Sequence, residues 1–156
     1  MQSASINQAG RRKPSHGVFI SASEPTIIFL TVCTKNRSPW LACDQAHLGL
    51  LQAWQEADAW MVGRYVLMPD HLHLFCAPQD AGVSLESWVH FWKGRFTRIV
   101  KNKAWRWQAQ HWDTRLRRDE SYAEKWEYVL QNPMRAGLVS EKGWPYCGEL
   151  DELRWW

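Results

Sequence analysis

The sequence predicts an α+β fold of the ferredoxin-like class: an antiparallel sheet built in the order β-α-β-β-α-β, with an added C-terminal helix. Apolar, β-branched runs predict the strands, and segments with apolar residues at helical spacing lie between them. At 156 residues, the chain is long enough for one domain whose core needs no disulfides. Because this fold hosts many functions, function has to be argued from the site residues.

The first strand and the first helix are predicted from the N-terminal half. TIIFLTVCT, residues 26–34, is β-branched and apolar, as is typical of a buried strand. A helix is expected to begin at Asp44 as N-cap and to run to about Trp60. Its inward-facing residues would be Leu48, Leu51, Ala53 and Trp54.

Two adjacent strands and a second helix follow. GRYVLM and HLHLFCAP are short strand patterns separated by the turn pair Pro69-Asp70. The polar residues around Glu86 precede an apolar run and favour a helix over 84–101. A fourth strand is predicted over 105–112, and a third helix from about Ser121 to Asn132-Pro133.

The chain divides into three segments by composition. Residues 1–25 are polar and form a basic arm, 26–145 form the folded domain, and 146–156 form an acidic tail. The four cysteines show no metal-binding spacing, and no signal peptide or 18-residue apolar span is evident. These features predict a reduced, cytoplasmic protein.

Positive charge is concentrated in one part of the chain. The net charge is only +3, but residues 93–118 carry nine Lys and Arg against Asp113 alone. Such a segment is a plausible footprint for a polyanion, most obviously nucleic acid. The alternative is a solvated helix face followed by a basic loop.

Several of the twelve tryptophans lie in this basic segment. Trp88 and Trp92 are four residues apart and are expected to form one apolar helix face. Trp105 and Trp107 alternate with charged residues, so they could stack on unpaired bases. A half-buried strand would explain the same pattern.

His71 and His73 lie two residues apart on a predicted strand, so their side chains share one face. They form either a metal-binding pair or a pair of edge histidines bonded to backbone or solvent. Tyr128 and Asn132 are four apart on the predicted third helix and therefore also share a face. If that helix crosses the sheet over the histidines, a phenol, a carboxamide and two imidazoles converge.

That combination suits phosphoryl transfer to tyrosine. A phenol with a pKa of about 10 is a weak nucleophile at neutral pH unless its target is activated. A divalent cation on the scissile phosphate neutralises charge and orients the leaving oxygen. The product would be a phosphotyrosine joined to one DNA end.

PDHLHLF and YVLQNPMRAGLV together resemble the HUH-type single-tyrosine transposases, specifically the REP-associated tyrosine transposases. The resemblance runs from about Arg11 to about Pro145. It implies that His71 and His73 bind Mg²⁺ or Mn²⁺, that Tyr128 on the added helix is the nucleophile, and that Asn132 completes the metal site. It further implies cleavage of single-stranded DNA near a hairpin, leaving a 3′-OH and a 5′ end on the tyrosine.

The DNA contacts are expected from the basic arm and the basic segment. They are Arg11, Arg12, Lys13, Arg95, Arg98, Lys101, Lys103, Trp105, Arg106 and Arg135. Two departures from the family bear on them: Thr114 stands where relatives often carry a histidine, and PSHGVF follows the arm in place of an aromatic run. The resemblance also implies a nucleoid-associated protein, either monomer or homodimer.

Two further residues have open roles. Asp70 could orient a ligand histidine or merely cap the turn, and Lys125 could ease phenolate formation or be an exposed helix lysine. Two other functions also stay open: a non-catalytic hairpin-binding protein with the same fold, and a metal-dependent hydrolase that uses water and dispenses with Tyr128.

Overall fold

The computed structural model describes residues 26–116, 122–139 and 143–153, and its centre is a five-stranded sheet in the order β4-β1-β3-β2-β5. All neighbouring strands are antiparallel. The strands are β1 (Ile28–Thr34), β2 (Trp60–Leu67), β3 (His71–Pro78), β4 (Trp107–Arg115) and β5 (Cys147–Glu149). The helices are η1 (Lys35–Arg37), α1 (Asp44–Glu56), α2 (Leu85–Val100), α3 (Tyr122–Leu130) and α4 (Asn132–Arg135).

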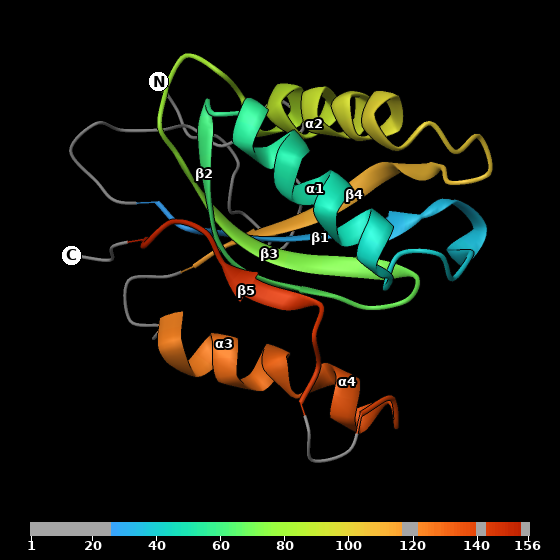
Figure 1. The fold of residues 1–156 in the computed structure, drawn as a ribbon. Helices are drawn as coiled ribbons and strands as arrows, with labels where there is room; N and C mark the ends of the chain where they lie inside the picture. The colour runs from blue at the N-terminus through green and yellow to red at the C-terminus, as the bar shows by residue number, and fades with distance from the viewer. Residues whose placement is uncertain (1–25, 117–121, 140–142, 154–156) are drawn as a thin grey trace.

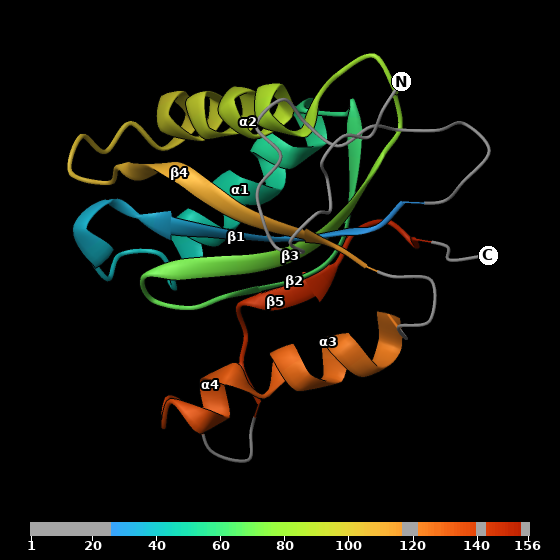
Figure 2. The same cartoon turned by 180° about the vertical axis from the view of Figure 1, so that it is seen from behind.

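The helices form a layer on each face of the sheet. Helices α1 and α2 cover one face, and α3 and α4 lie on the other, as Figures 1 and 2 show from opposite sides. Apart from the short η1, the elements from β1 to β4 follow the predicted order β-α-β-β-α-β, and their strands take the order 4-1-3-2. The ferredoxin-like prediction is therefore confirmed, and β5 extends the sheet at the β2 edge.

The larger core lies between α1, α2 and the sheet. Trp60, Trp88 and Trp92 are among its largest fully buried side chains. The Trp60 and Trp88 indole nitrogens donate to the carbonyls of Val83 at 2.8 Å and Ala57 at 2.7 Å, which satisfies two buried donors. The expectation that Trp88 and Trp92 are core residues is confirmed.

A second core lies between α3 and the opposite face of the sheet. Trp126 and Val129 of α3 are buried there against Val66 and Phe75. Phe75 contacts the Trp126 ring edge-on at a centroid distance of 6.4 Å. The central strands are thus covered on both faces, and the odd-numbered residues of β3 face α3.

The first helix differs from its prediction at both ends. Its N-cap is Cys43, not Asp44, and Asp44 is its first helical residue. The helix ends at Glu56, and Trp60 already belongs to β2. Of the residues predicted to face inward, Ala53 and Trp54 are buried, Leu51 is partly buried and Leu48 is 66% exposed. The buried face is completed by Ala46, Gly49 and Leu50.

The second helix begins as expected. Ser84 is its N-cap, and the hydroxyl of Ser84 accepts a hydrogen bond from the Ser87 backbone N–H at 3.1 Å. The helix ends where Lys101 adopts a left-handed conformation, with φ at 53°. The fourth strand is displaced toward the C-terminus relative to the predicted 105–112, since β4 begins only at Trp107.

The C-terminal region contains a break and an unpredicted strand. The third helix ends at Leu130, and a separate turn of helix, α4, begins at Asn132 with Pro133 near its start. Proline lacks the N–H that would continue the helix. Within the predicted tail 146–156, residues 147–149 form β5 beside β2. The arm 1–25, with Arg11, Arg12 and Lys13, lies outside the described residues.

A search of the described segments found no helix with the length and apolar character needed to cross a bilayer.

The contact between α1 and α2 depends on Gly49. A Cβ built at Gly49 would lie 2.7 Å from Val100 Cγ1 and 3.2 Å from a Phe96 ring carbon. We therefore expect Gly49→Ala to lower the free energy of unfolding by about 1–2 kcal/mol, because overpacking outweighs the better helix propensity of alanine. Chemical denaturation measures this change.

Gly94 provides the matched control on α2, since a Cβ there meets nothing within 4 Å. Gly94→Ala should raise the free energy of unfolding by about 0.5–1 kcal/mol. If both substitutions stabilised the protein, the close α1–α2 packing would be incorrect.

Candidate active site

The two histidines lie at the beginning of β3, on the sheet face that α3 covers. Their ring centroids are 4.8 Å apart and their planes are at 76° to each other. Strand alternation puts both side chains on this face. The predicted side-by-side placement of His71 and His73 is therefore confirmed.

His71 is oriented by Asp70. Its Nδ1 lies 2.8 Å from Asp70 Oδ1, and because a carboxylate only accepts, Nδ1 carries the proton and donates. Arg37 donates through Nε to the other Asp70 oxygen at 3.1 Å. Arg37 Nη2 also lies 3.4 Å from His71 Nδ1. Both nitrogens carry protons, so Nδ1 donates to the closer Asp70 oxygen and makes no hydrogen bond with Arg37.

The charge of Asp70 is retained by these partners. Burial acts to raise the pKa of this carboxyl group, but the hydrogen bonds from His71 and Arg37 outweigh it, so the pKa is lowered from its ordinary value. An ionised Asp70 accepts from Nδ1, so in the neutral His71 ring the nitrogen without a proton is Nε2. Of the two roles considered for Asp70, the geometry favours orientation of the histidine.

His73 is held by β1. Its Nδ1 lies 2.8 Å from Thr31 Oγ1, and its ring stacks on Phe29 with centroids 5.1 Å apart and planes at 20°. Burial, followed by the nearby His71, lowers the pKa of His73 to about 3. His73 is therefore a neutral imidazole at physiological pH, which is the form that binds metals.

These contacts fit a divalent metal. Both imidazoles use Nδ1 for a protein partner, which leaves Nε2 of each as the nitrogen for a ligand bond. The described residues hold no cluster of three or more His, Cys, Asp or Glu that could bind a metal. A site built on His71 and His73 therefore needs oxygen ligands of another kind, such as a carboxamide, water or phosphate.

Tyr128 and Asn132 are linked through Arg135. The Arg135 guanidinium lies 4.4 Å from the Tyr128 ring centroid and donates through Nη1 to the Tyr128 carbonyl at 3.2 Å. Its Nη2 donates to Asn132 Oδ1. The helix break separates Tyr128 and Asn132 into α3 and α4, so one arginine, rather than a continuous helix, joins the two.

The position of α3 relative to the histidines is shown by Lys125. Its Nζ lies 6.0 Å from the centroid of Phe29, the ring on which His73 stacks. The helix that carries Tyr128 thus passes over the strand next to the histidines. The Tyr128 side chain is 66% exposed, and its predicted convergence with the imidazoles stays a prediction.

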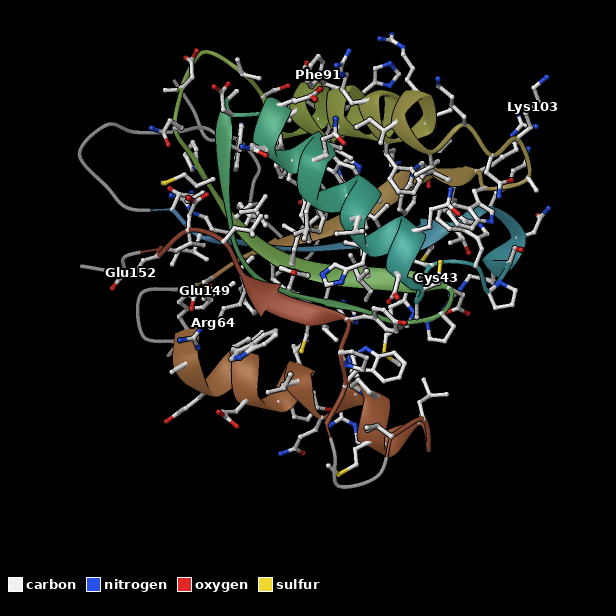
Figure 3. All side chains as sticks on the ribbon, in the orientation of Figure 1. Cys43, Arg64, Phe91, Lys103, Glu149 and Glu152 are labelled. Atoms are coloured by element: carbon white, nitrogen blue, oxygen red, sulfur yellow. The ribbon has the colours of Figure 1, made fainter. Side chains whose placement is uncertain are left out.

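The basic residues predicted to contact DNA fall into two groups. Arg95 is engaged by Glu56, with Nη2 2.5 Å from Oε1. Exposed cations occupy the end of α2 and the α2–β4 loop, where Figure 3 shows Lys103 projecting outward from the loop. They are Arg98, Lys101, Lys103 and Arg106. Trp105 is half-buried and stacks on Trp40 at 5.1 Å, so one of its faces is occupied.

The sequence reasoning missed cations at the end of β1. Lys35, Asn36 and Arg37 line a hollow of about 450 Å³ together with residues 107–109. Lys93 donates to the Gln108 carbonyl at 2.9 Å in the same region. The only sign of these cations in the sequence is the KNR run directly after the first strand. That run does not indicate that Arg37 contacts Asp70.

Sequence comparison finds one curated relative that resembles part of the chain. A Haemophilus influenzae protein assigned as a REP-associated tyrosine transposase is 26% identical over 94 residues. The match covers 51% of this chain and 53% of the relative, so it spans about half the length of that protein. No model of a known protein family matches the chain.

Two solved structures share the fold. One is a REP-associated tyrosine transposase bound to a REP hairpin, with a TM-score of 0.66 and 20% identity over 87% of this chain and 82% of the other. The second is a Deinococcus radiodurans protein assigned as a transposase, with a TM-score of 0.51 and 18% identity over 70% and 93%. The comparisons confirm the resemblance to REP-associated tyrosine transposases that the two sequence motifs indicated.

Proposed function

We propose that this protein is a metal-dependent single-stranded DNA endonuclease and strand transferase that acts at hairpin DNA through Tyr128. The observation that carries the proposal is the pair of imidazoles with Nδ1 engaged and Nε2 free, on the sheet face crossed by the helix of Tyr128. The resemblance to a transposase and the fold shared with a hairpin-bound transposase support it.

His71 and His73 would hold Mg²⁺ or Mn²⁺, with Asn132 as a third ligand through Oδ1. When bound, the cation would neutralise charge on the scissile phosphate and favour departure of its leaving oxygen. Two nitrogen ligands favour Mn²⁺ in affinity, since Mg²⁺ prefers oxygen. Asp70 and Thr31 would keep the two rings in the ligating orientation.

Tyr128 would supply the nucleophile. Its phenol oxygen would attack the phosphorus, the bond to the 3′ oxygen would break, and the DNA would end in a 3′-OH and a 5′-phosphotyrosine. The phenol proton would pass to solvent, to which this side chain is open, and the departing 3′ oxygen would take up a proton from solvent. Arg135, over the Tyr128 ring, would contact the same phosphate, because a guanidinium fork matches phosphate oxygens.

The other expected DNA contacts would act as a surface for the phosphate backbone. Residues Arg98, Lys101, Lys103 and Arg106 surround the α2–β4 loop, and Lys35 and Arg37 extend that surface to the edge of the histidine pair. Such contacts give sequence-independent, salt-dependent affinity. Arg11, Arg12 and Lys13 would add contacts from the arm.

A second candidate is a hairpin-binding protein without cleavage activity. One observation favours it: Asn132 Oδ1 accepts from Arg135, and Tyr128 is largely exposed, so neither is engaged with the histidines. In that case binding would survive removal of metal and would not need the phenol.

The first test is covalent adduct formation with an end-labelled single-stranded hairpin oligonucleotide, analysed on a denaturing gel. We expect a labelled protein band with Mn²⁺, and none with EDTA or in Tyr128→Phe, because the substitution removes the attacking oxygen. His71→Ala and His73→Ala should also abolish the band while hairpin binding on a native gel persists. An adduct formed by Tyr128→Phe would contradict the assignment of the nucleophile.

The second test concerns the orientation of His73. Thr31→Val removes the oxygen that holds Nδ1, so Mn²⁺ affinity measured by calorimetry on DNA-free protein should fall about 10- to 100-fold. Thr31→Ser keeps the hydroxyl and should bind Mn²⁺ like the wild type. Equal affinity of Thr31→Val and wild type would show that His73 does not depend on this bond, or is not a ligand.

A further inference from the structure

Trp112 is the only tryptophan of the described segments that is exposed, and it lies on a strand rather than a loop. Its side chain is 48% exposed, whereas the other described tryptophans are buried or half-buried. Exposing an indole forfeits the burial that the other tryptophans of this protein gain. The adjacent positions of β4, His111 and Asp113, face the core and are buried, so strand alternation turns Trp112 to the other face of the sheet.

The strand register places Trp112 in line with the candidate metal pair. Thr31 of β1 is the partner of Trp112 on one side and of His73 on the other. Directly opposite residues of a sheet share a face, so Trp112, Thr31 and His73 form one row across three strands. Two strand spacings separate the ends of this row, which puts the Trp112 backbone about 10 Å from that of His73.

The surroundings of Trp112 suit a nucleobase better than an apolar protein partner. Thr114, two residues along β4 and opposite Phe29 in the register, shares its face and carries a neutral donor and acceptor. The intervening Asp113 is buried on the opposite face, 3.4 Å from His111. Within the described part of β4, the open face therefore carries no carboxylate that would repel a phosphate.

Two cations lie near this row. Arg37 lies next to His71, with its Nη2 3.4 Å from Nδ1, and Lys125 lies 6.0 Å from the centroid of Phe29, two residues along β1 from Thr31. A nucleotide with its phosphate at the histidines would meet these cations, and its neighbour's base would reach the indole. An unpaired base stacks on an aromatic side chain in this way in many proteins that bind single strands.

We propose that Trp112 is the stacking platform for one unpaired base next to the scissile phosphate. The inference rests on the proposed function and adds to it a contact that positions the strand. Because stacking tolerates any base, Trp112 would set the position of the strand in the site rather than its sequence. The cut would then fall at a fixed distance from the base held on the indole.

The test couples a protein change to a DNA change. Fluorescence anisotropy measures the affinity of the full chain for hairpin oligonucleotides that carry one abasic site at each position of the unpaired flank. In the wild type, one position should lower affinity about 5- to 100-fold when its base is missing. Trp112→Ala should bind intact DNA more weakly than the wild type by a similar factor. Removing the base at that one position should then lower the affinity of Trp112→Ala no further.

Two variants serve as controls. Phe91 is also 48% exposed but lies on α2, on the opposite side of the sheet, as Figure 3 shows, so Phe91→Ala should bind every oligonucleotide like the wild type. Trp112→Phe keeps an aromatic face and should recover most of the affinity and the same abasic profile. Thermal melting of each variant shows whether a loss of binding comes from unfolding.

Several outcomes would overturn the inference. One is wild-type affinity in Trp112→Ala, which would leave the indole for a protein partner. Another is that Trp112→Ala and the missing base lower the affinity independently of each other at every position of the flank. Adduct formation is measured in the same samples. If an adduct forms through Tyr128 but the effects of Trp112→Ala and of the missing base are independent, only the role assigned to Trp112 is wrong. If the wild-type protein neither binds nor cuts the hairpin, the proposed function is wrong as well.

Discussion

The antiparallel pairing of β1 with β3 determines the geometry of the candidate site. This register places Thr31 opposite His73 and Phe29 opposite Phe75, so one strand supplies both the hydroxyl on Nδ1 and the ring on which the imidazole stacks. A slip of one residue would turn Thr31 and Phe29 to the other face of the sheet. The histidines would then lose the partners that set their orientation.

That register is held by burial on both faces of the central strands. On one face, the tryptophans and aliphatic residues beneath α1 and α2 form the larger core, and on the other Phe75 packs against α3. Burying a neutral imidazole between them costs less than burying a charged one, which is why the pKa of His73 lies so far below its ordinary value. The same packing that secures the strands therefore keeps His73 in a state able to bind metal.

The parts of the molecule that could be predicted from sequence depend on local chemistry. The pairing of His71 with His73 follows from strand periodicity, and the cap at Ser84 follows from residues within one turn. The parts that could not be predicted depend on distant partners. Neither the strand β5 nor the contact from Arg37 to Asp70 has a local signal, because each requires the sheet to have formed.

The break between α3 and α4 shows how a single residue shapes the part of the candidate site that carries Tyr128. Without an N–H on Pro133, the helix does not continue, and the Tyr128 carbonyl accepts from the Gln131 N–H at 3.3 Å and from Arg135. Arg135 reaches that carbonyl because α4 starts a new turn that brings its guanidinium back over the phenol. In a continuous α-helix the Tyr128 carbonyl would instead accept from the Asn132 backbone N–H. The sequence NPMR thus places a positive charge against the Tyr128 ring.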